Sequence, residues 1–172
     1  MDEMRIWTQP VTMKDIEPPC LQHMGDYVYR SEASGVELIR CSNVGEKLYL
    51  PDRISHQWIT ALGSGVLRNC NELTGAVLPR SLRSIGDYAF YQCEKLEEVR
   101  IADGVRSIGD HAFALCKNLK TLYVPPTVES IGEDAFEGIE DLTLSGAEDS
   151  AVHRYAREKG VPFVAAGGHS AA

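Results

Sequence analysis

Apolar positions along the chain recur with a period of 23 residues. The recurring pairs are Ile-Gly at residues 85–86, 108–109 and 131–132, and Ala-Phe at residues 89–90, 112–113 and 135–136. Cys93 and Cys116 keep the same spacing. Such self-similarity indicates stacked structural units, each too small to bury its own apolar face. The chain is therefore expected to fold as a solenoid.

Short segments of alternating apolar and polar residues separate these pairs. LEEVRI (96–101) and LKTLYV (119–124) follow an L-x-x-L-x-L pattern with β-branched residues among the apolar positions, which predicts short parallel strands. Turn residues follow each strand, and a second extended piece ends at each Ile-Gly pair. The segment with the Ala-Phe pair is expected to form one or two helical turns. Stacking at roughly 4.8 Å would turn the Ile and Phe positions into continuous internal columns.

Four copies of the unit are visible in the sequence. GSGVLRNCNEL (63–73) is a diverged first copy, because its apolar positions lie 23 residues before those of the next copy. In the last copy Ile139 replaces the cysteine, and the strand that follows is expected about three residues early. The array is expected to close there.

The predicted fold is a β-rich repeat solenoid with right-handed coils, stacked parallel strands and short helical turns. We expect an unassigned N-terminal extension (1–25), a β-rich lead-in (26–62), the repeats (63–144), a helix-strand cap (145–166) and a disordered tail (167–172). In the cap, Asp149 or Ser150 can act as N-cap of the helix and Gly160 can end it. The lead-in and the cap would cover the apolar ends of the array, as repeat proteins require.

The motif V-x-x-I-G-x-x-A-F-x-x-C-x-x-L-x-x-[VL]-x-[IV] resembles the BspA-type leucine-rich repeat found in many bacterial proteins. The match is specific over residues 77–144, and the resemblance extends over about residues 26–166. It implies a module for binding or adhesion, because such repeats are usually parts of surface or secreted proteins that hold other proteins. The expected partner is accordingly a protein ligand, not identified by the sequence.

Charge and composition restrict the other partners. The formal net charge of −8 and the pI near 5.1 disfavour nucleic acid, and no run of Lys and Arg counters them. We expect no membrane insertion, since no apolar run has membrane length, and we expect a monomer. The acidic start and the lack of a signal-like apolar stretch favour a cytoplasmic chain. An extracellular or cell-surface location is the alternative if the chain is a fragment.

The strands also predict where a protein would bind. In the L-x-x-L-x-L pattern the third and fifth positions face away from the core, because side chains alternate along a strand. One predicted row is Lys47, Gly75, Glu98, Thr121 and Asp141, and the other is Tyr49, Val77, Arg100, Tyr123 and Thr143. Tyrosine and arginine often anchor interfaces, but the rows can equally be a solvated sheet face.

Other candidate chemistries are weaker. Cys70, Cys93 and Cys116 are better explained as a buried thiol column than as a metal site, because each lies beside the inward Ala-Phe position. Gly63-Ser64-Gly65 lacks the further glycines and the lysine of a phosphate loop, and the five histidines have no metal-ligand spacing. His111 is interpreted as a variable surface position. We therefore expect no catalytic residue, no cofactor and no metal, with an unrecognised active site as a remote alternative.

Overall fold

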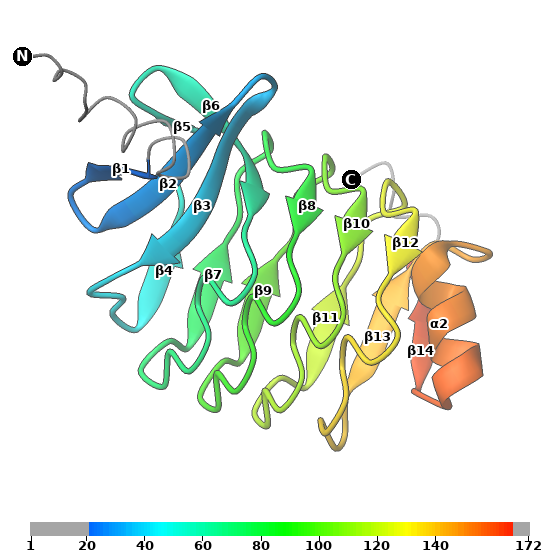
Figure 1. Ribbon diagram of the computed structural model, residues 1–172. Coiled ribbons are helices and arrows are strands. Elements are labelled where there is room, and N and C mark those ends of the chain that lie inside the picture. The colour runs from blue at the N-terminus through cyan, green and yellow to red at the C-terminus, as the bar shows by residue number, and fades with distance from the viewer. Residues whose placement is uncertain (1–20, 167–172) are drawn as a thin grey trace, which may run out of the picture.

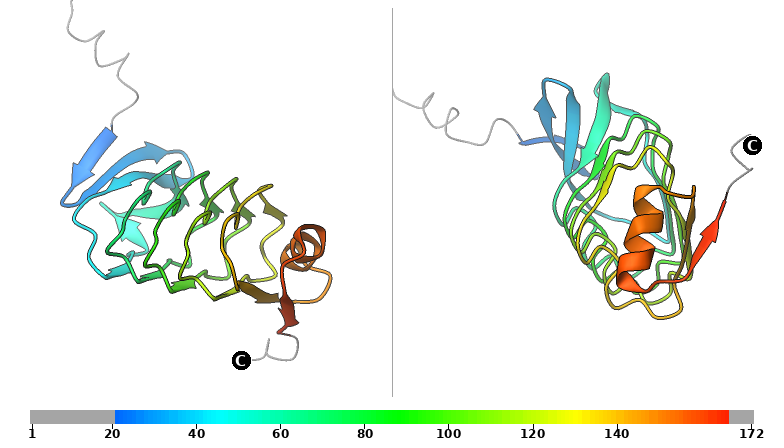
Figure 2. Two further views of the ribbon diagram at one scale, coloured as in Figure 1. Left: turned by 90° about the horizontal axis from the view of Figure 1, so that it is seen from below. Right: turned by 90° about the vertical axis from the view of Figure 1, so that its right-hand side faces the viewer.

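The computed structural model describes residues 21–166 and shows a stack of coils closed at both ends (Figure 1). Seen from below, successive coils follow one another like the turns of a spring, with a β-hairpin at one end and a helix at the other (Figure 2). The β-rich solenoid expected from the 23-residue period is confirmed. The tail predicted to be disordered, and most of the unassigned extension, lie outside the described residues.

Two stacks of parallel strands form the sides of the solenoid. The first contains β4 (Lys47–Tyr49), β7 (Gly75–Val77), β9 (Glu98–Arg100), β11 (Thr121–Tyr123), β13 (Thr143–Gly146) and β14 (Phe163–Ala165). It is hydrogen-bonded as two three-stranded sheets, β4-β7-β9 and β11-β13-β14, which lie next to each other in Figure 1. The second stack contains β6 (Gln57–Leu62), β8 (Ser84–Ile85), β10 (Ser107–Ile108) and β12 (Ser130–Ile131).

The lead-in extends the second stack. It contributes β1 (Leu21–Met24), β2 (Tyr27–Glu32), β3 (Gly35–Cys41) and β5 (Arg53–Ile54). β1, β2 and β3 form an antiparallel meander, and β3 then pairs in parallel with β6. The meander thereby covers the first coil with hydrogen-bonded backbone, and it begins within the stretch that the sequence pattern left unassigned.

Glycine sets the distance between coils at the end of each short strand. The amide of Gly86 donates to Leu62 O, that of Gly109 to Ile85 O and that of Gly132 to Ile108 O, each at 2.8 Å. A Cβ atom on Gly86 would lie 2.6 Å from Leu62 O. No larger residue fits between the backbones at this spacing, which explains why Ile is followed by Gly in each of these copies.

The Ala-Phe segments form consecutive turns instead of the expected helical turns. In the second copy, Ala89 N donates to Gly86 O and Cys93 N donates to Phe90 O. Tyr88 and Gln92 have φ of 58°, and a left-handed residue cannot continue an α-helix. The turns still point the apolar side chains inward: Ala89, Phe90 and Cys93 are completely buried.

The predicted phenylalanine column is confirmed. The Phe90 and Phe113 rings stack with centroids 5.0 Å apart, and Phe113 and Phe136 follow at 5.6 Å. The backbone repeats with them, because Phe90 N donates to Ala112 O and Phe113 N donates to Ala135 O of the next coil. One column thus combines apolar burial with coil-to-coil hydrogen bonds.

The C-terminal helix α2 (Ala151–Lys159) replaces the missing next coil. Tyr155 packs edge-on against Phe136 at 5.4 Å, and its hydroxyl accepts the hydrogen bond from Phe136 N, which has no further coil as partner. Ser150 is the N-cap, with its side chain accepting from His153 N, and Gly160 ends the helix at φ 71°, as the sequence indicates. Among residues 21–166, no helix combines the length and the apolar character needed to cross a membrane.

Candidate protein-binding face

The outward-facing side chains of β4, β7, β9, β11 and β13 form one surface, in which Val77, Thr143 and Ser145 are half-buried and the other members are exposed. We call this surface the repeat face; its members are Lys47, Tyr49, Val77, Glu98, Arg100, Thr121, Tyr123, Thr143 and Ser145. Their backbones are in register across β4, β7 and β9, and again across β11 and β13. Alternation along each strand places Leu48, Val99 and Leu122 in the core and their neighbours outside.

The structure corrects the predicted rows in the last coil. Thr121 pairs with Thr143 and Tyr123 with Ser145, so Thr143 belongs to the first row and Ser145 to the second. Asp141 lies before β13 and adopts a left-handed backbone conformation, with φ of 59°. Its side chain forms an ion pair with Lys120 at 3.6 Å. The strand comes one residue early, not about three, because Leu144 follows Leu122 by 22 residues.

Lys47 covers a gap in the first row. Gly75 carries no side chain and is buried, because the Lys47 side chain lies over it: a Cβ atom there would be 2.8 Å from Lys47 Nζ. The prediction that Gly75 lies in the exposed row is therefore wrong. Between Lys47 and Glu98 the surface consists of the end of the lysine side chain, including its ammonium group.

The second row is the more distinctive part of the repeat face. Tyr49 and Tyr123 are 69% and 45% exposed, although large aromatic side chains usually lie inside. Val77 and Arg100 stand between them, adjacent in register. Arg100 is exposed and forms no ion pair within the described part of the chain, whereas Lys95, Lys117 and Lys120 each pair with an acidic residue of a neighbouring coil.

A hollow of about 450 Å³ borders this row where the strands end. Val77 and Arg100 line its side toward the strands, and Leu50, Pro79 and Ile101 line its side toward the turns. The backbone reinforces this edge, since Leu50 N donates to Val77 O and Leu78 N to Arg100 O. An apolar group could enter the hollow while a polar group meets the guanidinium.

A larger groove of about 730 Å³ lies at the junction of the lead-in and the first coils. Its lining mixes acidic and basic side chains, including Asp52, Arg80 and Arg83, with Trp58, and contains no member of the repeat face. Ser81 also lines it, but its hydroxyl proton lies between two acceptors, Ile59 O at 2.7 Å from Oγ and Asp52 O at 3.1 Å. This hydroxyl joins the lead-in to the repeats, and no sequence pattern indicated this contact.

The cysteine column is buried at two of its three predicted positions, Cys93 and Cys116. Cys93 and Cys116 are completely buried and free, and each thiol donates to a backbone carbonyl at 3.1 Å, Leu67 O and Phe90 O respectively. Cys70 is only partly buried. A hydrogen bond with Cys116, together with burial, raises the pKa of Cys93 to about 12, although the hydrogen bond with Cys70 acts in the opposite direction.

We expect Cys93 to resist alkylation in the folded protein. The thiolate is the reactive species, and an unfolded thiol with a pKa of about 8.5 forms it readily near pH 8. Mass spectrometry after iodoacetamide treatment, with and without urea, measures the difference. Equal labelling rates of Cys93 in both samples would contradict its burial.

Parallel stacked strands, buried columns and an open face of short strands define a solenoid of the leucine-rich repeat class. The chain belongs to the BspA-type leucine-rich repeat family, whose sequence model matches residues 47–149 in six copies. The match has more copies than the four recognised in the sequence, and it starts at residue 47, upstream of the first of them, in a segment without an Ala-Phe pair.

Solved bacterial structures share this fold. A leucine-rich repeat protein from Bacteroides capillosus is 26% identical with a TM-score of 0.66, over 73% of this chain and 96% of that one. The T. pallidum leucine-rich repeat protein is 24% identical with a TM-score of 0.62, over 72% and 70%. A leucine-rich cell surface protein from Faecalibacterium prausnitzii is 23% identical with a TM-score of 0.66, over 86% of this chain and 40% of its own. No curated protein matches the chain.

Proposed function

We propose that the protein is a non-enzymatic protein-binding module that uses the repeat face. The observation that carries the proposal is the row Tyr49–Val77–Arg100–Tyr123, where an arginine without an ion pair in the described residues lies between exposed aromatic side chains. Arginine and tyrosine are the residue types that most often dominate binding energy at protein interfaces.

The physical setting favours binding over mere solvation. Tyrosine presents a large amphipathic surface and has few rotamers to lose on binding. The strands that carry the row are fixed by their ladders and by the core beneath, so little ordering is required when a partner docks. The hollow beside Val77 and Arg100 offers a site for an apolar side chain next to a site for an acidic or carbonyl group.

The hollow beside Arg100 and the larger groove at the lead-in support the non-enzymatic part of the proposal. Neither lining contains a cysteine or a histidine. The larger groove does hold serines and carboxylates, but the hydroxyl of its buried Ser81 is already donated to a backbone carbonyl. Both recesses open broadly to solvent, and an open surface does not exclude the water that competes with most reactions.

Affinity capture from a lysate of the source cells tests this proposal. Wild type is compared with the double variant Arg100→Glu and Tyr123→Ala, and we expect captured partner to fall at least about tenfold because two interface anchors are removed. Arg40→Glu, the charge reversal of an exposed arginine on β3, is the matched control. Each variant is checked for an unchanged melting curve.

Capture lost in the double variant and kept in the control supports the repeat face. Equal capture by the wild type and the double variant would move the site to another surface. No capture at all would contradict an intracellular partner and would favour an extracellular one. The cytoplasmic location and the monomeric state expected from the sequence remain predictions, which cell fractionation and light scattering address.

A further inference from the structure

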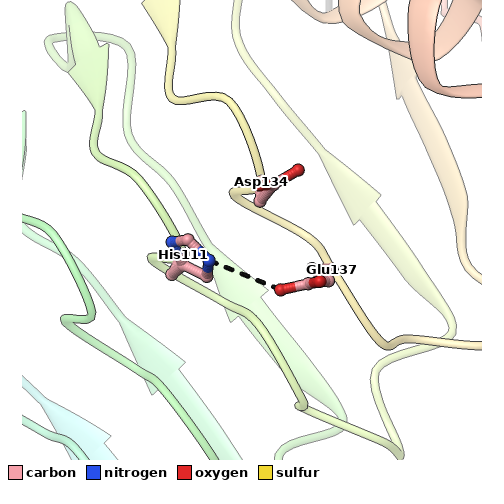
Figure 3. Close-up of side chains that lie close together, drawn as sticks. All are labelled: His111, Asp134 and Glu137. Carbon is pink, nitrogen blue, oxygen red and sulfur yellow. Dashed lines mark ion pairs between the residues drawn. The ribbon is translucent and has the colours of Figure 1, made fainter.

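Three potential metal ligands meet on the turn segments, outside the repeat face. His111, Asp134 and Glu137 each offer one ligand atom, and these atoms all lie within 4.8 Å of one another. His111 comes from one coil, and Asp134 and Glu137 come from the next (Figure 3). Its Nε2 lies 3.4 Å from Glu137 Oε2. Residues separated by 23 and 26 positions thus converge because the coils stack in register.

The imidazole is held in place before any ligand binds. His111 has φ of 56°, and its carbonyl accepts a hydrogen bond from Ala114 N in the tight turn. Its ring stacks on Tyr88 of the preceding coil, with centroids 4.9 Å apart and planes within 6°. Its Nδ1 is buried with no hydrogen-bond partner among the described residues, so Nε2 is the nitrogen that can reach an external ligand.

The donor set matches a transition metal better than a hard cation. An imidazole nitrogen with two carboxylate oxygens suits Zn²⁺, whose bonds to such atoms are about 2.0–2.2 Å, while Ca²⁺ and Mg²⁺ prefer oxygen alone. The carboxylates of Asp134 and Glu137 approach to within 4.8 Å and repel each other at that distance. A divalent cation between them would remove the repulsion. Three protein ligands leave a fourth position for water.

A lysine from the cap already competes for one of the carboxylates. Lys159 Nζ lies 3.0 Å from Asp134 Oδ1, and this hydrogen bond raises the pKa of Lys159. Glu137 Oε2 faces the imidazole of His111, and the two form an ion pair only when the ring is protonated. A bound metal would therefore share the Asp134 carboxylate with Lys159 or displace the Lys159 ammonium from it.

We propose that His111, Asp134 and Glu137 form a Zn²⁺ site that links two successive coils. The bound ion joins neighbouring turns through side chains, as the Phe113 and Ala135 backbones join them through a hydrogen bond. Because a ligand that binds only the folded state stabilises it, Zn²⁺ also raises the melting temperature of the array.

Calorimetric titration of the full chain with zinc chloride tests the site. His111→Asn keeps a residue that tolerates the left-handed turn, and Glu137→Gln keeps the shape of the side chain. Each is expected to weaken binding at least about tenfold, since loss of even a supporting group around a metal costs 10–100-fold. Glu140→Gln, an exposed carboxylate of the same coil, is the control and should bind as wild type does.

A gain of affinity provides a second test that misfolding cannot mimic. Lys159→Met removes the competing ammonium from Asp134 and is expected to bind Zn²⁺ severalfold more tightly. The proposal is overturned if wild type does not bind zinc, if His111→Asn and Glu137→Gln bind as well as wild type, or if Lys159→Met binds no more tightly.

Discussion

Phe113→Ala is expected to lower the free energy of unfolding by about 3–5 kcal/mol, against a total of roughly 5–15 kcal/mol for a domain. The side chain is completely buried and stacks on two other rings, Phe90 at 5.0 Å and Phe136 at 5.6 Å. Neighbouring coils are held at a fixed spacing by glycine and backbone hydrogen bonds, so they cannot collapse into the cavity. The melting temperature should fall by roughly 6–20 °C.

Circular dichroism during heating measures the effect, with Tyr123→Ala as the control. That substitution removes an aromatic ring of similar size from a position that is 45% exposed, and its cost should stay within about 0.5 kcal/mol. A Phe113→Ala curve within a few degrees of wild type would show that the phenylalanine column is not the core of the array.

Gly109→Ala is expected to destabilise the protein by about 1–3 kcal/mol, the usual cost of overpacking. The added Cβ atom would lie 2.4 Å from Asp87 Oδ1 and 2.6 Å from Asp87 N in the preceding coil. The side chain can rotate away, but the backbone can yield only if the coils separate. Separation would lengthen the hydrogen bonds from Gly109 N to Ile85 O and from Asp110 N to Asp87 Oδ1.

Urea denaturation of Gly109→Ala and Gly45→Ala separates this effect from the general effect of losing a glycine. A Cβ atom on Gly45 would meet nothing within 4 Å, so that variant should be neutral or slightly more stable than wild type. Equal denaturation midpoints for the two variants would contradict the close approach of the coils at the Ile-Gly position.

The parts of the fold predicted from the sequence are those that follow from stacking. A residue repeated every 23 positions must contact its own equivalents when coils stack, so the phenylalanine and cysteine columns follow from spacing alone. The helix caps at Ser150 and Gly160 follow from local chemistry. The outward-facing rows over β4 to β11 follow from side-chain alternation, except at the buried Gly75.

The remaining features depend on geometry that no local pattern encodes. The last coil is one residue shorter between Phe136 and Leu144 than its predecessor between Phe113 and Leu122. Leu142 is also apolar and mimics the repeat position that Leu144 occupies, so the strand was predicted two residues too early. Tyr155 completes the phenylalanine column through an edge-on contact from a helix, which has no repeat spacing.

The His111 cluster was missed because its ligands come from different coils. Their spacing of 23 and 26 residues was visible, since Asp134 and Glu137 occupy the positions that follow His111 by one repeat and by one repeat plus three residues. Metal motifs, however, are usually sought at helical or loop spacing. In a solenoid, residues separated by one period are neighbours, so their side chains can form a site together.

Site-specific photo-crosslinking in the source cells tests the central claim most directly, that the repeat face binds a protein. A photoreactive phenylalanine derivative is placed at Tyr123, and in a matched sample at Tyr88, a tyrosine on the turn segments that is also exposed, at 36%. We predict a discrete protein adduct from position 123 and none from position 88. Adducts from position 88 alone, or from neither position, would contradict the assignment of the repeat face as the binding surface.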